Sequence, residues 1–550
     1  MKNNISVLLL VIAVLGGTAL RLIGLSDSPP SLNWDEAALG YNAYSISETG
    51  RDEYGEFFPI FTRSFDDYKS AIPIYFMIPS IRIFGLNEFG VRFPSVILGI
   101  INIAIIFLLV FKITESGLAG LSSSFALSIE PWAVHYSRTF HEATTALFFF
   151  IVGWLMFIYS KKKNYLLPIS MFSFLLSLYT YHSNKLIVPL FLGILFLFNR
   201  RLILTYPKKI LASTILVLVG LVIPFIFFAF SGQAFARAGS TNIFIMWQAE
   251  TKGLRNNHLL PPIISHLIHN DTYYFLQAFF GRYLSYFSPT NLFLKEPPEN
   301  ALAGNSLFNS FEFVGWLTGL LIILKKGSRL KELIALMLIS PIPAALTWNW
   351  FQPTRSLTLL LVFSIAIGIG LEKIIRTVLY LCQESRYLKI LLSGGLISLL
   401  AFIYISWAVY ILDSTLVYLP LRDSGQWQPG FRETVPIIYQ FSQKYDQVII
   451  ETPHAQPYIF YLLYSQYPPN EYLKQLDLKK IGNPRKHYDF GKFKFRKIYW
   501  PEDRNLQKTL FVGNDFNLPT SDIDSQPGAK VVTQIMGLDG YIAAKVVSKE

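Results

Sequence analysis

Residues 91–113 read VRFPSVILGIINIAIIFLLVFKI, an apolar run about as long as an α-helix must be to cross the hydrocarbon core of a bilayer. Similar runs fill most of residues 1–412. We interpret ten of them as further helices, at 5–25, 116–137, 142–160, 165–181, 186–204, 208–230, 311–324, 329–348, 356–376 and 387–412. The pattern therefore predicts a polytopic α-helical membrane protein with about eleven transmembrane helices.

The composition agrees with a membrane location. Of the 550 residues, 52% are hydrophobic and 15% are charged, against about 25% charged residues in a typical soluble domain. The 46 Phe and 30 Tyr suit packed helices and aromatic belts at the membrane surface. The formal net charge of +12 would suit a protein that binds nucleic acid. The excess of basic residues, however, falls largely in short loops between helices, where membrane topology explains it. We therefore expect membrane lipids, and no nucleic acid, among the partners.

The distribution of positive charge predicts the orientation in the cell membrane, because cytoplasmic loops are enriched in Lys and Arg. With the N-terminus in the cytoplasm, the basic clusters at 161–163, 200–209 and 325–331 all fall on that side. An odd number of spans then places the C-terminus outside. Cys382 falls in a cytoplasmic loop, and as the only cysteine it can form no intramolecular disulfide. The first run has no convincing cleavage site, so we interpret it as a retained helix.

Three regions fall outside the membrane in this topology. Residues 26–90 and 231–310 are long outer segments, and such loops are usually functional or disordered. Their aromatic content argues against disorder. From residue 413 the pattern changes to a mixed α/β type, with helices at 432–444 and 458–464 and strands at 447–450, 492–499, 509–512, 530–534 and 541–546. The predicted organisation is a transmembrane domain at 1–412 and an extracytoplasmic α/β domain at 413–550.

The start of the first outer segment carries a candidate general base. Asn33-Trp34-Asp35-Glu36 has a capping residue followed three positions later by an acid, which is the capping-box arrangement. Glu36 can therefore have this capping role or a functional one. Asp35 fits the capping role less well. A carboxylate at a rigid helix start near the outer membrane face suits a general base, although acids in a first helical turn also gain from the helix dipole.

Basic residues also occur on the outer side, where topology disfavours them. They include Lys69, Arg138, Lys185 and Arg355. Each alone is compatible with a solvated side chain. Together they predict a shared anionic ligand, because ammonium and guanidinium groups bind phosphate.

The turn between the third and fourth predicted spans concentrates ionisable residues. It reads HYSRTFHE over 135–142 and ends with His141 and Glu142. Ionisable groups at membrane depth are costly and are functional candidates by default, although a turn can also simply reach water. His182 is a further candidate in a later outer turn.

The sequence shows neither a zinc-protease motif nor a cluster of metal ligands. His141-Glu142 does not begin a zinc-protease motif, because residue 145 is Thr instead of the second His. No ligand cluster indicates a divalent metal, so we expect no cofactor.

The candidate residues resemble the motifs of a known family. Asn33–Glu36 resembles the Asp-Glu motif of the GT-C membrane glycosyltransferases, and in particular of family 39, which includes protein O-mannosyltransferases and aminoarabinose transferases. Over roughly residues 1–380 further likenesses follow in the family's order: KSAIPIY at 69–75, FGLNEFGVRFP at 84–94, Ser137-Arg138 with Glu142, and QPTR at 352–355. This chain departs from the family at Ser70-Ala71 (usually two Pro), Glu142 (usually Asp) and Gln352 (usually His).

The resemblance implies that residues 1–412 form a GT-C-like catalytic domain. Its reaction would be inverting transfer of a sugar from a polyprenyl-phosphate carrier to an acceptor hydroxyl on the extracytoplasmic side. Asp35 would be the catalytic base, and Glu36 and Glu142 would position donor or acceptor. The remaining candidates would bind the lipid phosphate (Lys69, Arg138, Arg355) or have weaker claims to a role (His141, His182, Lys185).

The residues leave alternatives open. A transporter or lipid flippase for a lipid-linked sugar is one, although transporters often show repeated halves and this chain shows no internal symmetry. A non-catalytic scaffold would leave Asp35, Glu36 and the outer cations unexplained. An oligosaccharide transferase that uses a lipid diphosphate would commonly need a metal. The acceptor can be protein, lipid or glycan, and we hypothesise from position alone that the C-terminal domain selects it.

Overall fold

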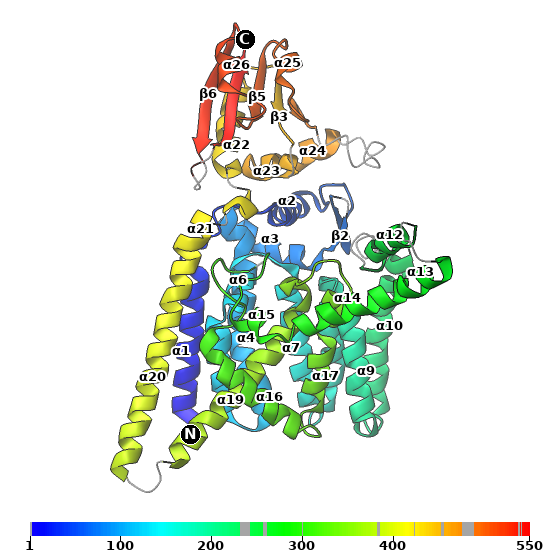
Figure 1. The fold of residues 1–550 in the computed structure, drawn as a ribbon, viewed down its shortest axis with the longest axis vertical. Coiled ribbons are helices and arrows are strands. Elements are labelled where there is room, and N and C mark those ends of the chain that lie inside the picture. Colours follow the sequence, from blue (N-terminus) through cyan, green and yellow to red (C-terminus); the bar gives the residue numbers. More distant parts are fainter. Residues whose placement is uncertain are drawn as a thin grey trace. The chain divides into compact units, whose positions relative to one another are not determined.

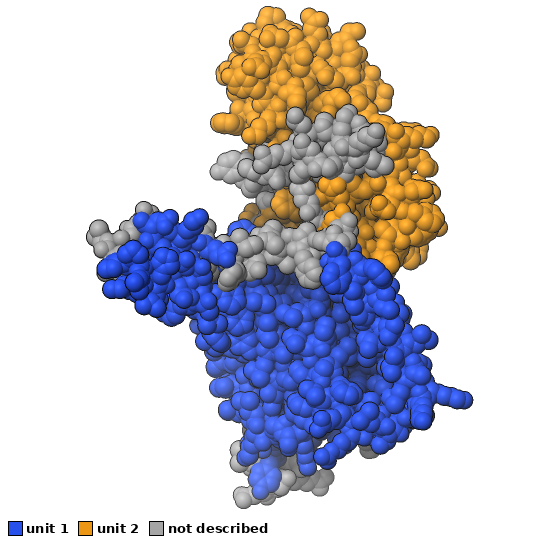
Figure 2. Space-filling view, turned by 90° about the vertical axis from the view of Figure 1, so that its right-hand side faces the viewer, with its two compact units in different colours: residues 1–23, 95–412 blue, residues 24–94, 413–550 orange. Residues whose placement is uncertain are grey.

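The computed structural model describes residues 3–65, 67–230, 243–256, 261–299, 301–381, 386–422, 424–428, 430–452, 456–475, 489–536, 540 and 542–550. Cys382 and parts of the outer segment 231–310 lie outside these residues. The chain forms two compact units, which Figure 2 shows in blue and orange. The first joins 1–23 to 95–412, and the second joins 24–94 to 413–550. The sequence indicated no such grouping of 24–94 with the C-terminal region.

The first unit is a helical bundle, and its long helices run alongside one another in Figure 1. Each of the eleven predicted spans is helical. The helices are α1 (Asn3–Leu22), α4 (Glu88–Thr114), α5 (Gly117–Ile129), α6 (Pro131–Arg138), α7 (Glu142–Ser160), α8 (Leu167–Thr180), α9 (Asn184–Ile203), α10 (Lys208–Phe230), α16 (Phe313–Lys325), α17 (Lys331–Ile339), α18 (Ile342–Ala345), α19 (Leu357–Leu381) and α20 (Arg386–Asp413).

Within the described residues, 7 helices are long and apolar enough to cross a membrane: Asn4–Leu22, Glu88–Thr114, Glu142–Ser160, Asn184–Ile203, Lys208–Phe230, Pro353–Tyr380 and Ser393–Arg422. Two predicted spans are broken instead of continuous. One breaks at Pro131 between α5 and α6, and the other at Pro341 between α17 and α18. Proline explains both breaks, because it lacks the N–H that a continuous helix needs and its ring clashes with the preceding turn. The chain is an integral membrane protein of mainly helical architecture, as predicted.

Small residues bring two of these helices into backbone contact. A side chain at Gly319 of α16 would collide with the carbonyl of Ala366 in α19, and one at Gly370 of α19 would collide with the carbonyl of Gly315. Such close approach is typical of helix packing in membranes. Between α10 and α16, the described parts of the outer segment form the shorter helices α12 (Ile243–Asn256), α13 (Pro262–Ile268), α14 (Asp271–Ser285) and α15 (Pro289–Phe293).

The second unit begins with the segment that carries Asp35. It contains α2 (Trp34–Thr49), an antiparallel hairpin of β1 (Phe61–Ser64) and β2 (Asp67–Ser70), and α3 (Ile72–Phe84). Helix α4 starts in this unit and continues as a single helix into the first.

The C-terminal part of the second unit is the predicted mixed α/β fold. Its sheet has the order β4-β3-β5-β7-β6, in which β3 runs parallel to β4 and β5 whereas β7 is antiparallel to β5 and β6. The strands are β3 (Gln447–Ile450), β4 (Phe493–Phe495), β5 (Thr509–Gly513), β6 (Ala529–Met536) and β7 (Ile542–Lys549). The helices are α21 (Leu419–Arg422), α22 (Phe431–Ser442), α23 (Pro457–Tyr464), α24 (Pro469–Gln475), α25 (Trp500–Asp503) and α26 (Thr520–Asp524).

The apolar core of this sheet contains Ile449 of β3, Phe511 of β5 and Val547 of β7. The predicted strand 492–499 is shorter than expected. It ends at Phe495, and Tyr499 becomes the N-cap of α25 because Trp500-Pro501 starts a helix there.

Candidate active site

The second unit presents Asp35 at the capped start of α2. The side-chain oxygen of Asn33 accepts the Glu36 N–H at 2.8 Å, and Glu36 in turn accepts the Asn33 N–H at 3.2 Å. The predicted capping box is therefore present, and it satisfies amide groups that a helix start leaves without partners. Glu36 is fully buried, whereas the side chain of Asp35 is 44% exposed. Of these two neighbouring acids, Asp35 is the one that a substrate can reach from solvent.

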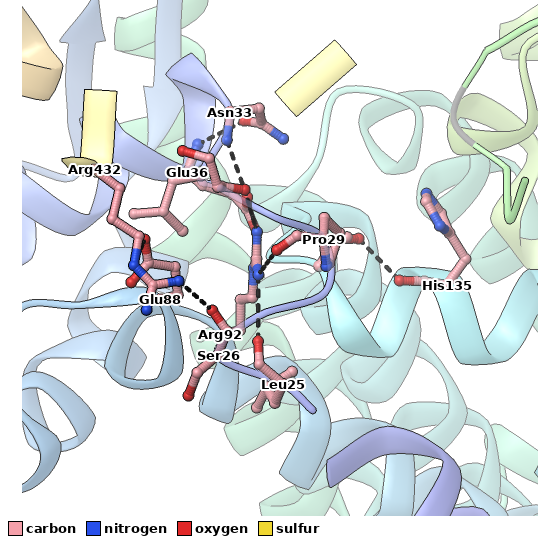
Figure 3. Close-up of polar contacts among 12 residues, drawn as sticks. Leu25, Ser26, Pro29, Asn33, Glu36, Glu88, Arg92, His135 and Arg432 are labelled. Carbon is pink, nitrogen blue, oxygen red and sulfur yellow. Dashed lines mark hydrogen bonds and ion pairs between the residues drawn. The ribbon is translucent and has the colours of Figure 1, made fainter. Parts of the chain in front are cut away.

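Arg92 fixes the chain around this helix start. Its guanidinium binds both carboxylate oxygens of Glu36, at 3.1 and 3.2 Å, and also donates to the carbonyl of Pro29 (Figure 3). It donates to the carbonyl of Ser31 as well. Arg92 and Glu36 are both fully buried. A planar guanidinium suits this task because it presents several donors in a fixed arrangement. Sequence reasoning assigned no role to Arg92, although a cation at the outer start of an apolar helix was a signal that could have drawn attention to it.

The hairpin brings Lys69 to Asp35. The Lys69 ammonium group forms an ion pair with Asp35 Oδ1, although the two residues are 34 positions apart in the chain. Lys69 lies on β2 opposite Thr62 and is itself buried. The register of the hairpin therefore aims a buried cation at a half-exposed carboxylate, and two of the predicted site residues meet.

Residues from the C-terminal part of the chain support the segment that leads to Asp35. Tyr464 donates its hydroxyl hydrogen bond to Glu88 at 2.8 Å and lies 3.1 Å from the hydroxyl of Ser31. Arg432 donates to the Ser26 carbonyl at 3.0 Å and lies 3.8 Å from Glu88 (Figure 3). Sequence reasoning missed both residues, because nothing local in the chain marks contacts over such separations.

A buried acid lies behind α2. Glu53 accepts hydrogen bonds from the side chains of Asn42, at 2.9 Å, and Tyr458, at 3.1 Å. Burial raises the pKa of Glu53 to about 8. Burial likewise raises the pKa of the neighbouring Asp52 to about 6. Both carboxyls carry protons at a higher pH than usual, which lowers the cost of burying them.

The first unit gathers three turns that are distant in sequence. One pocket is lined by residues from the start of α7, from the turn before α9 and from the turn before α19: Ala143, Tyr181, Ser183, Asn184, Thr354 and Arg355. The hydroxyls of Tyr136 and Thr354 are hydrogen-bonded at 2.5 Å, which ties α6 to the start of α19. Arg355 thus lines a pocket with residues adjacent to Glu142 and Lys185. A ligand shared by these turns stays a prediction.

Arg138 has a structural role that the sequence did not indicate. Its guanidinium donates to the carbonyls of Leu20 and Ile23 at 2.9 and 2.8 Å. These carbonyls belong to the end of α1, where a helix leaves acceptors without intrahelical donors and where positive charge is favoured. The side chain is buried. A role of Arg138 in phosphate binding stays a prediction.

The weaker candidates have aromatic or polar neighbours. Lys185 lies 3.3 Å from Nδ1 of His182 and 5.6 Å from the centre of the Phe228 ring. His141 is the N-cap residue of α7, and its ring centre lies 4.8 Å from that of Tyr136. In the described part of the chain, no three His, Cys, Asp or Glu side chains form a group that could hold a metal.

The family model described as Dolichyl-phosphate-mannose-protein mannosyltransferase matches residues 69–228. The crystal structure of ArnT from Cupriavidus metallidurans bound to undecaprenyl phosphate superposes with a TM-score of 0.55 and 12% sequence identity. The alignment covers 100% of this chain and 98% of that one. This chain has the fold of the GT-C membrane glycosyltransferases. The resemblance seen in the motifs is thereby confirmed at the level of fold.

Other solved structures with the GT-C fold match as well. The apo state of the same ArnT gives a TM-score of 0.54 at 11% identity, covering 98% of this chain and 97% of that one. An oligosaccharyltransferase from Archaeoglobus fulgidus tethered to an acceptor peptide gives 0.49 at 12% identity over 84% of this chain. This chain spans 63% of that protein's length. No curated protein matches in sequence.

Proposed function

We propose that this GT-C chain is an inverting glycosyltransferase that moves a sugar from a polyprenyl-phosphate carrier to an acceptor hydroxyl on the extracytoplasmic side of the membrane. The observation that carries the proposal is the Asp35–Lys69 pair, in which a half-exposed carboxylate at a rigid helix start meets a buried cation. The family match and the GT-C fold support a glycosyltransferase in general. The ArnT structure holds undecaprenyl phosphate, which supports a lipid phosphate as the carrier here.

Each residue would act as follows. Asp35 takes the proton of the acceptor hydroxyl while that oxygen attacks the anomeric carbon of the sugar. The bond between the anomeric carbon and the phosphate oxygen breaks on the opposite face, and its electron pair stays with the lipid phosphate. Cations lower the barrier because they stabilise the charge that grows on this leaving group. Lys69, Arg138 and Arg355 are the candidate cations for this task.

The orientation belongs to the same proposal. With the N-terminus in the cytoplasm, the turns that hold Glu142, Lys185 and Arg355 share the outer side with the segment that carries Asp35. A transporter or flippase remains the second candidate, but it would give the Asp35–Lys69 pair no role.

The test is sugar transfer in proteoliposomes from a panel of radiolabelled polyprenyl-phosphate sugars. We expect transfer or donor hydrolysis by the wild type, and its loss in Asp35→Asn with donor binding and thermal midpoint unchanged. Asp27→Asn is the matched control, because Asp27 is a highly exposed carboxylate in the same segment. Equal activity of Asp35→Asn and wild type would remove Asp35 from the mechanism. A chain that binds none of these lipids would contradict the proposal.

A further inference from the structure

The break between α5 and α6 places an acid inside the helical bundle of the first unit. Glu130 is the C-cap residue of α5, directly before Pro131, and its side chain is fully buried. Its Oε2 accepts a hydrogen bond from the hydroxyl of Ser364 in α19 at 2.7 Å. Its Oε1 is buried and has no hydrogen-bond partner among the residues that the structure describes. Buried polar atoms normally have a partner, so this oxygen requires an explanation.

A second buried acid comes from the start of α16. Glu312 ends the short 3₁₀ helix Ser310–Glu312, and its side chain is 1% exposed. Its Oε2 accepts the backbone N–H of Asn309 at 2.9 Å and the side-chain amide of Asn309 at 3.2 Å. The same amide nitrogen donates to the carbonyl of Ile129 at 3.3 Å. One nitrogen thus reaches both Glu312 and the residue before Glu130, and the two carboxylates are close enough for their charges to repel each other.

The amide of Asn309 adds a second acceptor without a donor. The carbonyl of Ile129 and the carboxylate of Glu312 are both acceptors, so the nitrogen of the amide must face them and its Oδ1 must face away. Asn309 is 1% exposed, and its Oδ1 has no hydrogen-bond partner in the described part of the chain. An amide held between two buried acids therefore presents a free oxygen there, as Glu130 does.

The nearest cation is already engaged elsewhere. The two terminal nitrogens of the buried Arg21 donate to backbone carbonyls at 2.9 to 3.2 Å, those of Gly17, Leu127 and Ser128. Two of these carbonyls belong to the last turn of α5, where the helix leaves them without intrahelical donors. With two carboxylates and one guanidinium, the group carries one negative charge in excess. A buried charge without compensation is costly, so one further positive charge is required.

The surroundings favour a monovalent metal ion as that charge. Carboxylate and amide oxygens are the ligands of hard cations. The carbonyl end of a helix carries partial negative charge, and α5 presents this end at Glu130. In membrane proteins, the C-terminal ends of broken helices and the carbonyls that a break frees coordinate Na⁺. A divalent ion would instead leave one positive charge in excess.

We propose that Glu130 Oε1, Asn309 Oδ1 and the Glu312 carboxylate form a buried site for one sodium ion. The ion would join the break between α5 and α6 to the start of α16. The site belongs to the first unit, whereas the Asp35–Lys69 pair belongs to the second. The role of the ion is to stabilise the bundle, and it takes no part in the proposed sugar transfer.

Binding of radioactive sodium to the purified full chain in detergent tests the inference. We expect saturable binding by the wild type, with competition by unlabelled sodium chloride and none by choline chloride. Glu130→Gln removes one ligand charge and is expected to weaken binding at least several-fold. Glu332→Gln is the matched control and should bind as the wild type does, because Glu332 is an acid of the same bundle that has Lys161 as its partner at 3.0 Å.

The thermal midpoint of the wild type provides a second measurement, which stands even if Glu130→Gln fails to fold. An ion that binds only the folded state stabilises it, so the midpoint should rise as sodium replaces choline at constant total salt. A wild type that binds no sodium would overturn the inference, and so would equal binding by wild type and Glu130→Gln.

Two further results would overturn the choice of ion. Stronger competition by calcium than by unlabelled sodium would show that the site prefers a divalent ion. An infrared band of a protonated carboxyl that is present in the wild type and absent from Glu130→Gln would show that Glu130 holds a proton in place of sodium. None of these measurements requires turnover, so this inference and the proposed transferase activity can fail separately.

Discussion

Arg92 Nε lies 3.1 Å from Glu36 Oε1, and neither side chain is exposed to solvent. Two charges removed from water in this manner are tolerated only as a pair, and removal of one partner leaves the other buried and uncompensated. Because the same guanidinium binds the carbonyls of Pro29 and Ser31, this ion pair also shapes the chain that leads to Asp35.

Glu36→Gln is therefore expected to destabilise the protein strongly. The expected loss is about 3 to 5 kcal/mol, the usual cost of breaking a buried pair from one side. Thermal unfolding in detergent measures it. Arg376→Gln breaks the ion pair with Glu372, in which the Arg376 side chain is 62% exposed, and is expected to cost about 1 kcal/mol or less. Equal effects of the two substitutions would contradict a special role for the buried pair.

Lys69→Gln is expected to reduce sugar transfer by about 100-fold or more, as for the loss of one preorganised group that stabilises transition-state charge. Single-turnover transfer from a saturating donor measures this loss. Lys185→Gln serves as control, because the Lys185 ammonium lies against the rings of Phe225 and Phe228 and is expected to matter less. A larger loss in Lys185→Gln than in Lys69→Gln would reverse our assignment.

The buried acid Glu53 predicts a pH dependence of stability. Its pKa is raised from the ordinary 4.5 to about 8, so the folded protein binds more protons than the unfolded chain between these values. Stability must then fall as the pH rises through this interval. Thermal midpoints from about pH 5 to about pH 9 should show the fall in the wild type and a smaller fall in Glu53→Gln. Glu48→Gln, an exposed change in the last turn of α2, should keep the wild-type slope; a flat wild-type profile would exclude a protonated Glu53.

Tyr464 is expected to order the segment before α2. Tyr464→Phe removes the hydrogen bonds to Glu88 and Ser31, and a lost buried hydrogen bond costs about 1 to 3 kcal/mol. Amide hydrogen exchange of residues 24–33 should therefore be about tenfold faster in this variant. The exposed Tyr499→Phe should leave exchange there unchanged. Unaltered exchange in Tyr464→Phe would show that the segment is held by other contacts.

We expect sugar transfer to be independent of divalent metal, because Lys and Arg side chains supply the positive charge that stabilises the leaving lipid phosphate. Treatment with EDTA followed by dialysis should leave the rate of transfer unchanged. Loss of activity that added manganese restores would instead favour a lipid-diphosphate donor, whose transfer commonly uses a metal.

The sequence predicts well what depends on local pattern. Apolar runs predict each helix of the bundle, Asn33 and Glu36 predict the start of α2, and alternating residues predict most of the C-terminal strands. The helix breaks at Pro131 and Pro341 could also have been predicted, because a proline disrupts the helical turn that precedes it.

What the sequence could not predict depends on contacts over long separations. Tyr464 and Ser31 are 433 positions apart, and no periodicity marks such a pair. Arg138 illustrates a second reason. An arginine in an outer turn can bind a phosphate or cap a neighbouring helix, and only the positions of the Leu20 and Ile23 carbonyls reveal the capping role. The same ambiguity explains why the sequence analysis gave Arg92 no role, although Arg92 lies in the recognised motif at 84–94.

The second unit is built from two pieces of chain that are synthesised far apart in time. Residues 24–94 leave the ribosome first, and residues 413–550 follow only after the entire helical bundle. At about 5 to 20 residues per second, the first piece waits on the order of half a minute for Arg432, Tyr458 and Tyr464. During biogenesis the second unit is therefore incomplete for this time, and Glu53 and Glu88 lack these partners. A premature stop within residues 413–431 would leave a chain in which residues 24–94 never acquire Arg432, Tyr458 and Tyr464 as partners.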